Sequence, residues 1–255
     1  MPFLNTDLRE GILTLTIERP PANAFNLSLI EELLSAFRQA GRDSQTRVVV
    51  LTGAGKVFSA GQDITEMKAS GETISYRRHL LETYNPLILQ IRNLPRPVIA
   101  AINGTCAGAS LGIALACDLR FAADSARFVV GFNGIGLAPD SGVSLLLPAL
   151  VGLGRATELT FGNQPLSAEK ALEWGLVNRI VPFDNLMAET RQTAVHLAAG
   201  AVGVFGLSKR LFNHAVLPNL EEMLDYEAHI QEIASKSPEH REGIAAFLEK
   251  RSPKF

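Results

Sequence analysis

The first part of the chain shows short apolar runs separated by longer amphipathic stretches. Residues 11–18 alternate in polarity and are rich in β-branched side chains, which predicts a strand. Residues 47–52 and 97–102 are continuous apolar runs, as is typical of parallel strands buried on both faces. Residues 118–123 predict a further strand of the same kind.

Helical spacing of apolar residues fills the gaps between these runs and dominates the last third of the chain. Leu29, Leu33 and Phe37 recur at the spacing of a buried helix face, and beyond Leu186 only helices are predicted. Strands and helices that alternate in this way predict an α/β layer structure. The first helix can be capped by Asn26 or Ser28, and the other helices include residues 76–91, 108–117 and 238–250.

Composition and charge place the chain among compact globular proteins. Hydrophobic residues make up 47% and charged residues 20% of the 255 residues, unlike disordered chains. The 24 basic and 26 acidic residues give a net charge of −2, so we expect no nucleic-acid partner. No signal peptide is visible and no apolar run is long enough to cross a bilayer, so we expect no membrane association.

Patterns that bind metals or form disulfides are not visible either. Cys106 and Cys117 have neither the spacing of a metal site nor that of a disulfide framework, which favours a cytoplasmic location. None of the histidines makes a metal-ligand spacing with a carboxylate or a cysteine, so we expect surface or capping roles for them and no metal. These histidines are His79, His196, His214, His229 and His240.

Two turns of small residues follow predicted strands, at residues 58–64 and 102–110. The backbone N–H groups at such turns and at the start of the following helix have no partner within the helix. Two of them aimed at one oxygen would form an oxyanion hole. Small residues after a strand also suit close helix packing, and this alternative stays open on the pattern alone. Neither turn has the Lys-Ser or Lys-Thr of a nucleotide-binding P-loop.

Residues 58–64 and 101–118 resemble the two signature segments of the crotonase superfamily, also called the enoyl-CoA hydratase/isomerase family. The resemblance continues through residues 128–142 and ends with residues 246–251. It implies an α/β fold with a spiral of ββα turns and a C-terminal helical trimerisation region, divided as residues 1–195 and 196–255. It also implies an acyl-CoA substrate, no separate cofactor, and assembly as a homotrimer or a dimer of trimers.

The resemblance further implies which residues contact the substrate. The oxyanion donors of the family fall at the backbone N–H groups of Gln62 and Ala109. Phe247 and Lys250 correspond to residues that approach the coenzyme of a neighbouring subunit, and Phe132 lies in the third similar segment. Adenine and pantetheine contacts fall at Ala22, Ala24, Ala60, Asp63 and Ile64.

Carboxylates distinguish the reactions of this family. Its hydratases resemble one another in using two glutamates, whose positions in this chain hold Gly112 and Phe132. Asp140, in an apolar turn, remains as a candidate base, and burial there would raise its pKa. A lone Asp before a helix is also a common N-cap. Asp63 and Glu66 are further candidates, for which solvated or capping roles are expected.

Residues 58–63, 107–109 and 137–142, together with Tyr84 and Asn85, resemble the ring-1,2-epoxyphenylacetyl-CoA isomerases of phenylacetate catabolism. This likeness implies that Asp140 acts on an epoxidised aromatic acyl-CoA, with isomerisation of 3-enoyl-CoA to 2-enoyl-CoA as a related activity.

Other readings stay open. A 4-chlorobenzoyl-CoA dehalogenase would use Asp140 as nucleophile, although its supporting histidine and ring-packing tryptophan fall at Asn85 and Phe132. A protein that carries the name enoyl-CoA hydratase without the activity, or a non-catalytic acyl-CoA-binding scaffold, would also lack the two glutamates. The acyl group is not fixed by the sequence, because the pocket wall comes from residues 65–84, where the family likeness is poor.

Overall fold

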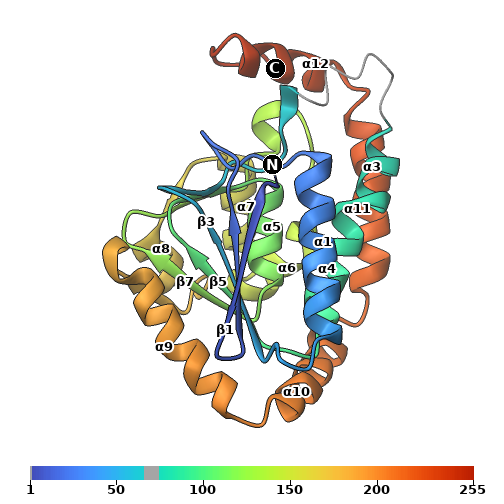
Figure 1. The fold of residues 1–255 in the computed structure, drawn as a ribbon. Coiled ribbons are helices and arrows are strands. Elements are labelled where there is room, and N and C mark those ends of the chain that lie inside the picture. Colours follow the sequence, from blue (N-terminus) through green and yellow to red (C-terminus); the bar gives the residue numbers. More distant parts are fainter. Residues whose placement is uncertain (1, 66–74) are drawn as a thin grey trace.

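The computed structural model describes residues 2–65 and 75–255, whose strands form a large and a small sheet (Figure 1). The large sheet has the order β1 (Leu4–Arg9), β2 (Ile12–Ile17), β3 (Val48–Gly53), β5 (Val98–Ile102), β7 (Leu119–Ala123) and β10 (Arg179–Val181). The small sheet has the order β4 (Val57–Ser59), β6 (Thr105–Ala107), β8 (Arg127–Val129) and β9 (Leu166–Ser167).

Within the large sheet, strands β2 to β10 run parallel and β1 pairs with β2 in antiparallel fashion. All residues of β3 and β5 are buried, which explains their continuous apolar sequences. The strands predicted from the sequence are confirmed as β2, β3, β5 and β7. Strand β1 was not predicted, because five of its six residues are exposed on this edge strand and leave little apolar signal.

Helices cover both faces of the large sheet. On one face, Val49 and Leu51 pack in a core with Leu29 and Leu33. On the other face, Val48 packs in a second core with side chains of α9. The helices are α1 (Leu27–Arg42), α3 (Tyr76–Glu82), α4 (Tyr84–Asn93), α5 (Ala109–Ala116), α6 (Val143–Val151), α7 (Leu153–Gly162), α8 (Ala168–Glu173), α9 (Leu186–Ala199), α10 (Val202–Val216), α11 (Leu220–Ala234) and α12 (Pro238–Leu248), with 3-10 turns η1 (Asn133–Ile135) and η2 (Phe183–Asn185).

The chain visits the two sheets in a repeating order. A strand of the large sheet leads to a strand of the small sheet and then to a helix, as in β5, β6 and α5. The repeat of β3 and β4, β5 and β6, and β7 and β8 gives the ββα spiral that the family resemblance implied. The chain continues into helices α9 to α12, so the predicted C-terminal helical region is also confirmed. No helix of the described segments combines the length and the apolar character that crossing a membrane requires.

One predicted helix is divided in two. The prediction of a single helix over residues 76–91 is wrong, because the backbone leaves the helical region at Thr83 (φ −122°, ψ −79°). The Thr83 hydroxyl donates to the carbonyl of His79 at 2.5 Å, a local bond that bends or ends helices. The break lets α4 begin at Tyr84, whose ring is buried. The polar segment predicted at residues 65–73 lies outside the described residues apart from Thr65.

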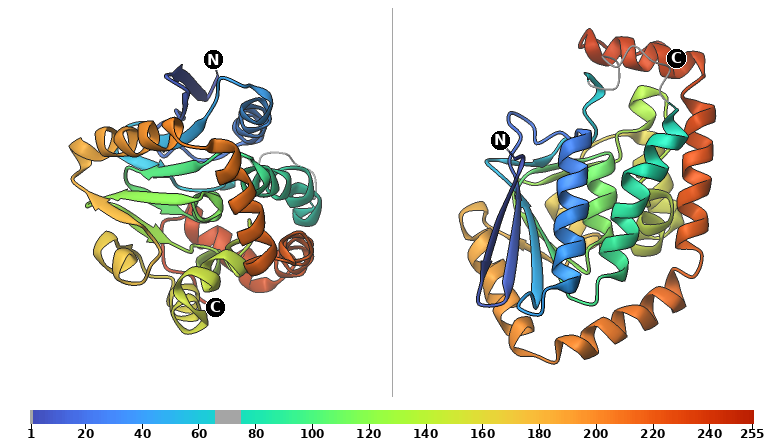
Figure 2. Two further views of the ribbon diagram at one scale, coloured as in Figure 1. Left: turned by 90° about the horizontal axis from the view of Figure 1, so that it is seen from below. Right: turned by 45° about the vertical axis from the view of Figure 1, so that its right-hand side comes forward.

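The C-terminal helices wrap around this core. Helix α10 lies along the lower end of the molecule, and α11 rises beside α3 and α4 to reach α12 at the top (Figure 2). Helix α12 packs closely on η1: a Cβ atom added at Gly136 would lie 2.5 Å from the backbone of His240. The last helix is therefore held against the segment that leads to Asp140.

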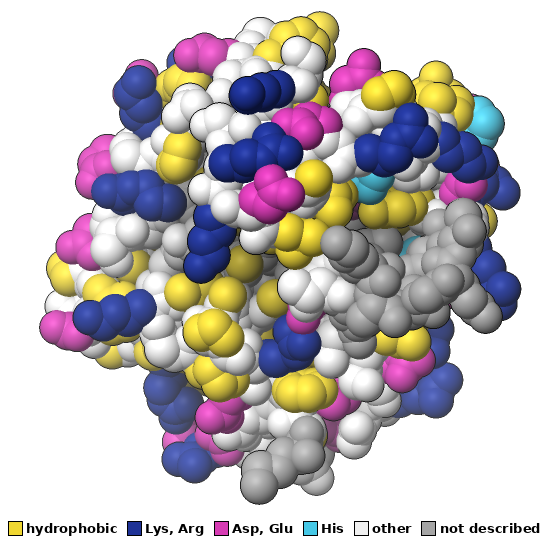
Figure 3. Space-filling model, turned by 90° about the horizontal axis from the view of Figure 1, so that it is seen from above, with side chains coloured by type: hydrophobic (Ala, Val, Ile, Leu, Met, Phe, Trp, Pro, Cys, Tyr) yellow, Lys and Arg dark blue, Asp and Glu magenta, His cyan; other side chains and the backbone are white. Residues whose placement is uncertain are grey.

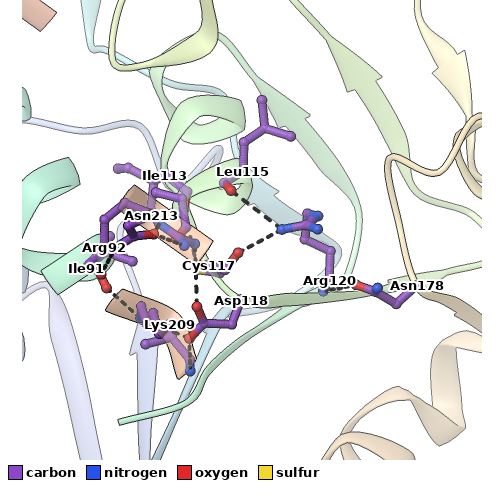
Figure 4. Close-up of polar contacts among 12 residues, drawn as sticks. Ile91, Arg92, Ile113, Leu115, Cys117, Asp118, Arg120, Asn178, Lys209 and Asn213 are labelled. Carbon is purple, nitrogen blue, oxygen red and sulfur yellow. Dashed lines mark hydrogen bonds and ion pairs between the residues drawn. The ribbon is translucent and has the colours of Figure 1, made fainter. Parts of the chain in front are cut away.

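A buried ionic cluster fastens α10 to the core (Figure 4). The ammonium of Lys209 is 2.9 Å from an Asp118 carboxylate oxygen and donates to the carbonyl of Ile91 at 2.8 Å. Arg92 approaches the other oxygen of Asp118 at 3.4 Å. The cluster joins α10, α4 and the start of β7, at the end of α5 opposite the glycine-rich turn.

Candidate active site

The two glycine-rich turns lie against each other. A Cβ atom added at Gly61 would be 2.6 Å from the carbonyl oxygen of Ala107 and 3.3 Å from the nitrogen of Ala109. The buried Ser110 hydroxyl bridges the turns, because it donates to the carbonyl of Ser59 at 2.8 Å and accepts from the N–H of Ala107 at 2.9 Å. Gly61 has a φ of +85°, which favours glycine at this point of closest approach.

The turns present two free N–H donors. Gln62 pairs with Phe25 in an isolated β-bridge whose hydrogen bonds are donated by the N–H groups of Phe25 and Asp63. The N–H of Gln62 takes no part in this bridge. Ala109 is the first residue of α5, where an N–H has no partner within the helix. Among the described residues, none accepts a hydrogen bond from either N–H. Two adjacent donors of this kind can bind one carbonyl oxygen and stabilise negative charge on it.

A cavity of about 1160 Å³ opens over these turns, and both Gln62 and Ala109 line it. Its lining is mostly apolar and includes Leu80, Leu137 and Ile135. On the face seen from above, Lys and Arg side chains are interspersed with Asp and Glu (Figure 3). All residues expected to contact substrate line this cavity: Ala22, Ala24, Ala60, Asp63, Ile64, Phe132, Phe247 and Lys250.

Two residues near the C-terminus line the cavity. The family likeness predicts that Phe247 and Lys250 approach the coenzyme of a neighbouring subunit. Here they line the cavity of their own chain. The close packing of α12 on η1 places them there. Arg251 and Phe255 extend this rim.

Asp140 lines the same cavity and is 7% exposed. Its Oδ1 accepts from the Ser141 hydroxyl at 2.7 Å, and its Oδ2 accepts from Nε2 of Gln231 at 2.6 Å. Burial raises the pKa of Asp140 to about 6, against the two hydrogen bonds, which lower it. The expected increase is confirmed, and a carboxylate with this pKa is ionised at neutral pH and a stronger base than an exposed one.

Asp140 is not the N-cap of α6. The cap residue is Gly142, and the carboxylate of Glu227 on α11 accepts from the N–H groups of Gly142 at 2.8 Å and Ser144 at 3.0 Å. A side chain from a distant helix therefore fills the role that a local aspartate often has. The Asp140 carboxyl stays available to the cavity.

The two positions where the hydratases place glutamates carry no ionisable group here. A Cβ atom at Gly112 would lie 2.2 Å from the carbonyl oxygen of Ser141, so α5 and the Asp140 turn are in direct contact. Phe132 is buried and lines the cavity. Within the described lining, Asp140 and Asp63 are the carboxyl groups.

Asp63 has a structural role. Its carboxylate pairs with Arg19 at 2.7 Å and accepts from the backbone and the hydroxyl of Thr65. Burial acts to raise the pKa of Asp63, but the bonds from Thr65 and Arg19 outweigh it and lower the pKa. The capping role expected for Asp63 agrees with these contacts, while Glu66 lies outside the described residues.

Sequence reasoning missed a polar cluster beside the oxyanion turn. The side-chain Oε1 of Gln62 accepts from the Tyr84 hydroxyl at 2.6 Å and lies 3.2 Å from Nε2 of His79. Because Oε1 can only accept, His79 carries its proton on Nε2, and burial lowers its pKa so that the ring is neutral. His79 and Tyr84 lie on different helices, and no local sequence pattern marked them as neighbours of Gln62.

A second polar pair, Tyr76 and His240, lies near Asp140. His240 Nδ1 donates to the carbonyl of Ile135 at 2.8 Å, so its Nε2 accepts from the Tyr76 hydroxyl at 2.9 Å. Burial, and then the charge of Asp140, raise the pKa of Tyr76 to about 12. The surface or capping role expected for His79 and His240 is wrong. His196, His214 and His229 are exposed as expected.

Metal binding finds no support in the residues described, which contain no cluster of three or more His, Cys, Asp or Glu side chains placed for a metal ion. Cys106 and Cys117 are buried, and burial raises the pKa of each thiol to about 12. Neither cysteine is a reactive group at neutral pH.

The fold is a ββα spiral, and its largely apolar cavity brings together two unpartnered backbone N–H groups and one buried carboxyl group. A model of the family "Enoyl-CoA hydratase/isomerase" matches residues 7–255. The chain therefore belongs to the enoyl-CoA hydratase/isomerase family, as the sequence motifs indicated.

Relatives within this family have different reactions in their names. The chain is 40% identical to the 1,2-epoxyphenylacetyl-CoA isomerase of Escherichia coli K12, over 100% of this chain and 98% of the relative. It is 33% identical to 4-chlorobenzoyl coenzyme A dehalogenase-2 of an Arthrobacter species, over 97% and 91%. The crystal structure of an enoyl-CoA hydratase from Mycobacterium avium subsp. paratuberculosis K-10 superimposes with a TM-score of 0.90 at 36% identity, covering 99% and 98% of the two chains. Membership of the family thus supports action on a CoA thioester. It does not distinguish isomerisation from hydration or dehalogenation.

Proposed function

We propose that this protein is a coenzyme A thioester isomerase in which Asp140 moves a proton next to a carbonyl held by the N–H groups of Gln62 and Ala109. The observation that carries the proposal is the combination of two unpartnered amides and one buried carboxyl in a single cavity. Hydration needs a second acid or base, and the positions that would hold it are Gly112 and Phe132.

The reaction begins with the thioester oxygen between the two amides. Each donor contributes about 3 to 4 kcal/mol when negative charge develops on that oxygen. Asp140 takes a proton from C2, the C2–H electron pair becomes the enolate, and the same carboxyl returns the proton to C4 of a 3-enoyl-CoA. One base therefore completes the migration of the double bond, and no atom is gained or lost.

The substrate is either 1,2-epoxyphenylacetyl-CoA, rearranged to an oxepin, or a 3-enoyl-CoA. The mostly apolar lining around Phe132, Leu137 and Ile135 suits an unsaturated or ring-bearing acyl group. The 40% identity to an epoxyphenylacetyl-CoA isomerase over the whole chain favours the first. Coenzyme A belongs to the substrate in both cases, so the proposal includes no separate cofactor.

Dehalogenation of 4-chlorobenzoyl-CoA is the second candidate, favoured by Asp140 beside Gly112 and by the dehalogenase relatives. Asp140 would then attack the aromatic ring and chloride would leave. Asn85, where the supporting histidine falls, donates to the carbonyl of Leu224 and is not part of the described cavity lining. His79 does line the cavity, but its Nε2 is engaged by Gln62.

A panel of three thioesters separates these functions. The protein is incubated with a 3-enoyl-CoA, a 2-enoyl-CoA and 4-chlorobenzoyl-CoA, alongside the Asp140→Asn variant and Asp7→Asn as an exposed control. We expect double-bond migration by the parent and by Asp7→Asn and none by Asp140→Asn, with binding of the thioester retained. Hydration of the 2-enoyl-CoA would contradict the assignment. Release of chloride from 4-chlorobenzoyl-CoA would establish a dehalogenase. Binding of the thioesters without turnover would establish a non-catalytic scaffold.

We also propose a homotrimer or a dimer of trimers, following the family likeness. Helix α10 leaves a row of apolar side chains exposed in the single chain, which is consistent with burial against another subunit. Light scattering on the purified protein tests this proposal, and a monomer would refute it. The exposed residues are Val204, Leu207, Leu211, Phe212 and Val216.

A further inference from the structure

Helix α11 sends two fully buried polar side chains toward the turn that carries Asp140. Gln231 is 0% exposed and Glu227 is 3% exposed. Both reach across from a helix about ninety residues further along the chain, since their partners on the turn lie 83 to 93 positions away. Buried polar groups are costly unless they are hydrogen-bonded, and these two have partners on the turn.

Gln231 uses both ends of its amide there. Its Oε1 accepts from the N–H of Ala138 at 3.2 Å, and its Nε2 donates to Oδ2 of Asp140 at 2.6 Å. The orientation of the amide is fixed by chemistry, because the backbone N–H of Ala138 can only donate and must face the oxygen. The nitrogen therefore faces Asp140, and Oδ2 of Asp140 accepts its hydrogen bond.

Glu227 holds the other side of the same turn. Its two oxygens accept from the N–H groups of Gly142 and Ser144 at the start of α6. Ser141 and Gly142 both have positive φ values (+55° and +80°). Glycine adopts such values readily, but serine does so rarely, so the backbone at Ser141 is held in an unfavourable conformation. The contacts from α11 fix this turn at both of its ends.

We infer that Gln231 is a positioning residue for Asp140: it holds the carboxylate over the oxyanion turns and keeps it ionised, while Glu227 anchors the backbone of the turn. The inference rests on the proposed function and deepens it. Neither side chain lines the cavity as described, so both act through Asp140 and not on the substrate.

Charges around Asp140 agree with this division of roles. The titratable groups on packed elements whose pKa the charge of Asp140 raises are Tyr76 on α3 and Glu227 on α11. Burial raises the pKa of Glu227 to about 7, and the charge of Asp140 adds to the increase. The Gln231 amide works in the opposite direction, because a donor to the ionised form lowers the pKa of Asp140.

The test measures the ionisation of Asp140 directly. Infrared difference spectra between the parent and Asp140→Asn, recorded from about pH 4 to 9, isolate the carboxyl stretch of this residue. Gln231→Met keeps the length and apolar body of the side chain and removes the donor. Gln231→Glu keeps an acceptor for the N–H of Ala138 and replaces the donor with an acidic oxygen. His229→Gln, on the exposed face of α11, is the matched control.

We expect the pKa of Asp140, about 6 in the parent, to rise by about 1 pH unit in Gln231→Met and further in Gln231→Glu. The acidic limb of kcat should move by the same amount, which means about tenfold slower turnover at pH 5. KM should stay near the parent value. A side chain with a merely structural role would lower kcat at every pH and leave the limb in place.

An unchanged pKa of Asp140 in the Gln231 variants would overturn the inference. If Gln231→Met fails to fold, Gln231→Glu carries the same test because it preserves the size of the side chain. Turnover by Asp140→Asn would instead refute the proposed function and leave the infrared result standing. The two failures are therefore distinguishable.

Discussion

Replacing Asp140 with Asn should make the protein more stable at neutral pH. Burial raises the pKa of this carboxyl from 3.8 to about 6, so the folded chain disfavours the ionised form that the unfolded chain carries freely. Asparagine has nearly the same shape and no charge to bury. It can still accept from Gln231 and donate to the Ser141 hydroxyl, which occupy the same places in the parent.

The magnitude follows from the difference in pKa. A change of about 2 pH units corresponds to about 3 kcal/mol of unfolding free energy, as an order of magnitude. Because the pKa of Asp140 is higher in the folded than in the unfolded chain, the protonated carboxyl contributes stability. This contribution is fully present below the unfolded pKa near 4 and is lost as the pH rises through about 6. The parent should therefore be about 3 kcal/mol less stable than Asp140→Asn at pH 8, and the two should be equal at about pH 4.

Urea unfolding at a fixed protein concentration measures this difference, since association of subunits would otherwise shift the apparent stability. Asp7→Asn, an exposed carboxylate on β1, serves as the control and should follow the parent at both pH values. Equal stability of the parent and Asp140→Asn at pH 8 would show that folding does not raise the pKa of Asp140. A lower stability of Asp140→Asn than of the parent at that pH would show that the surroundings of Asp140 stabilise the ionised carboxylate in the parent, which would make it a weaker base.

Three further outcomes are expected. Gly112→Ala places a methyl group 2.2 Å from the Ser141 carbonyl oxygen and must shift the Asp140 turn, so kcat should fall about a hundredfold with acyl-CoA binding retained in calorimetry. Lys209→Met removes the buried cation that pairs with the partly exposed Asp118 and should lower the unfolding free energy by about 3 kcal/mol in urea, whereas an unchanged urea midpoint would show that the cluster does not anchor α10. In the parent, kcat/KM should fall below about pH 6 as Asp140 becomes protonated, and a flat profile down to pH 5 would exclude it as the base.

Local sequence patterns predicted the parts of the fold that depend on local burial. The runs that became β3 and β5 are apolar because both of their faces are covered, and the cap at Asn26 is a contact with the N–H of Leu29 three residues on. Strand β1 escaped prediction because its exposed residues carry no apolar period. The break at Thr83 escaped because the apolar spacing continues across it.

The site shows the same limit. Gln62, Ala109 and Asp140 were predicted from motifs that resemble those of the family, and all three line one cavity. Their surroundings could not be read in that way. Gln231 contacts Asp140 across 91 positions, and nothing in its local sequence distinguishes it from any other glutamine on a helix. Tertiary contacts of this range are set by packing of whole helices.

The proposed function requires one chemical ability above all, which is removal of a proton from the carbon beside a bound thioester carbonyl. Exchange at C2 of phenylacetyl-CoA in D₂O measures this ability by proton NMR, whatever the natural acyl group is. We predict that the parent protein and Asp7→Asn replace the C2 protons with deuterium and that Asp140→Asn does not, although it binds the thioester. Exchange by Asp140→Asn at the parent rate, or no exchange by the parent above pH 7, would show that Asp140 is not the base.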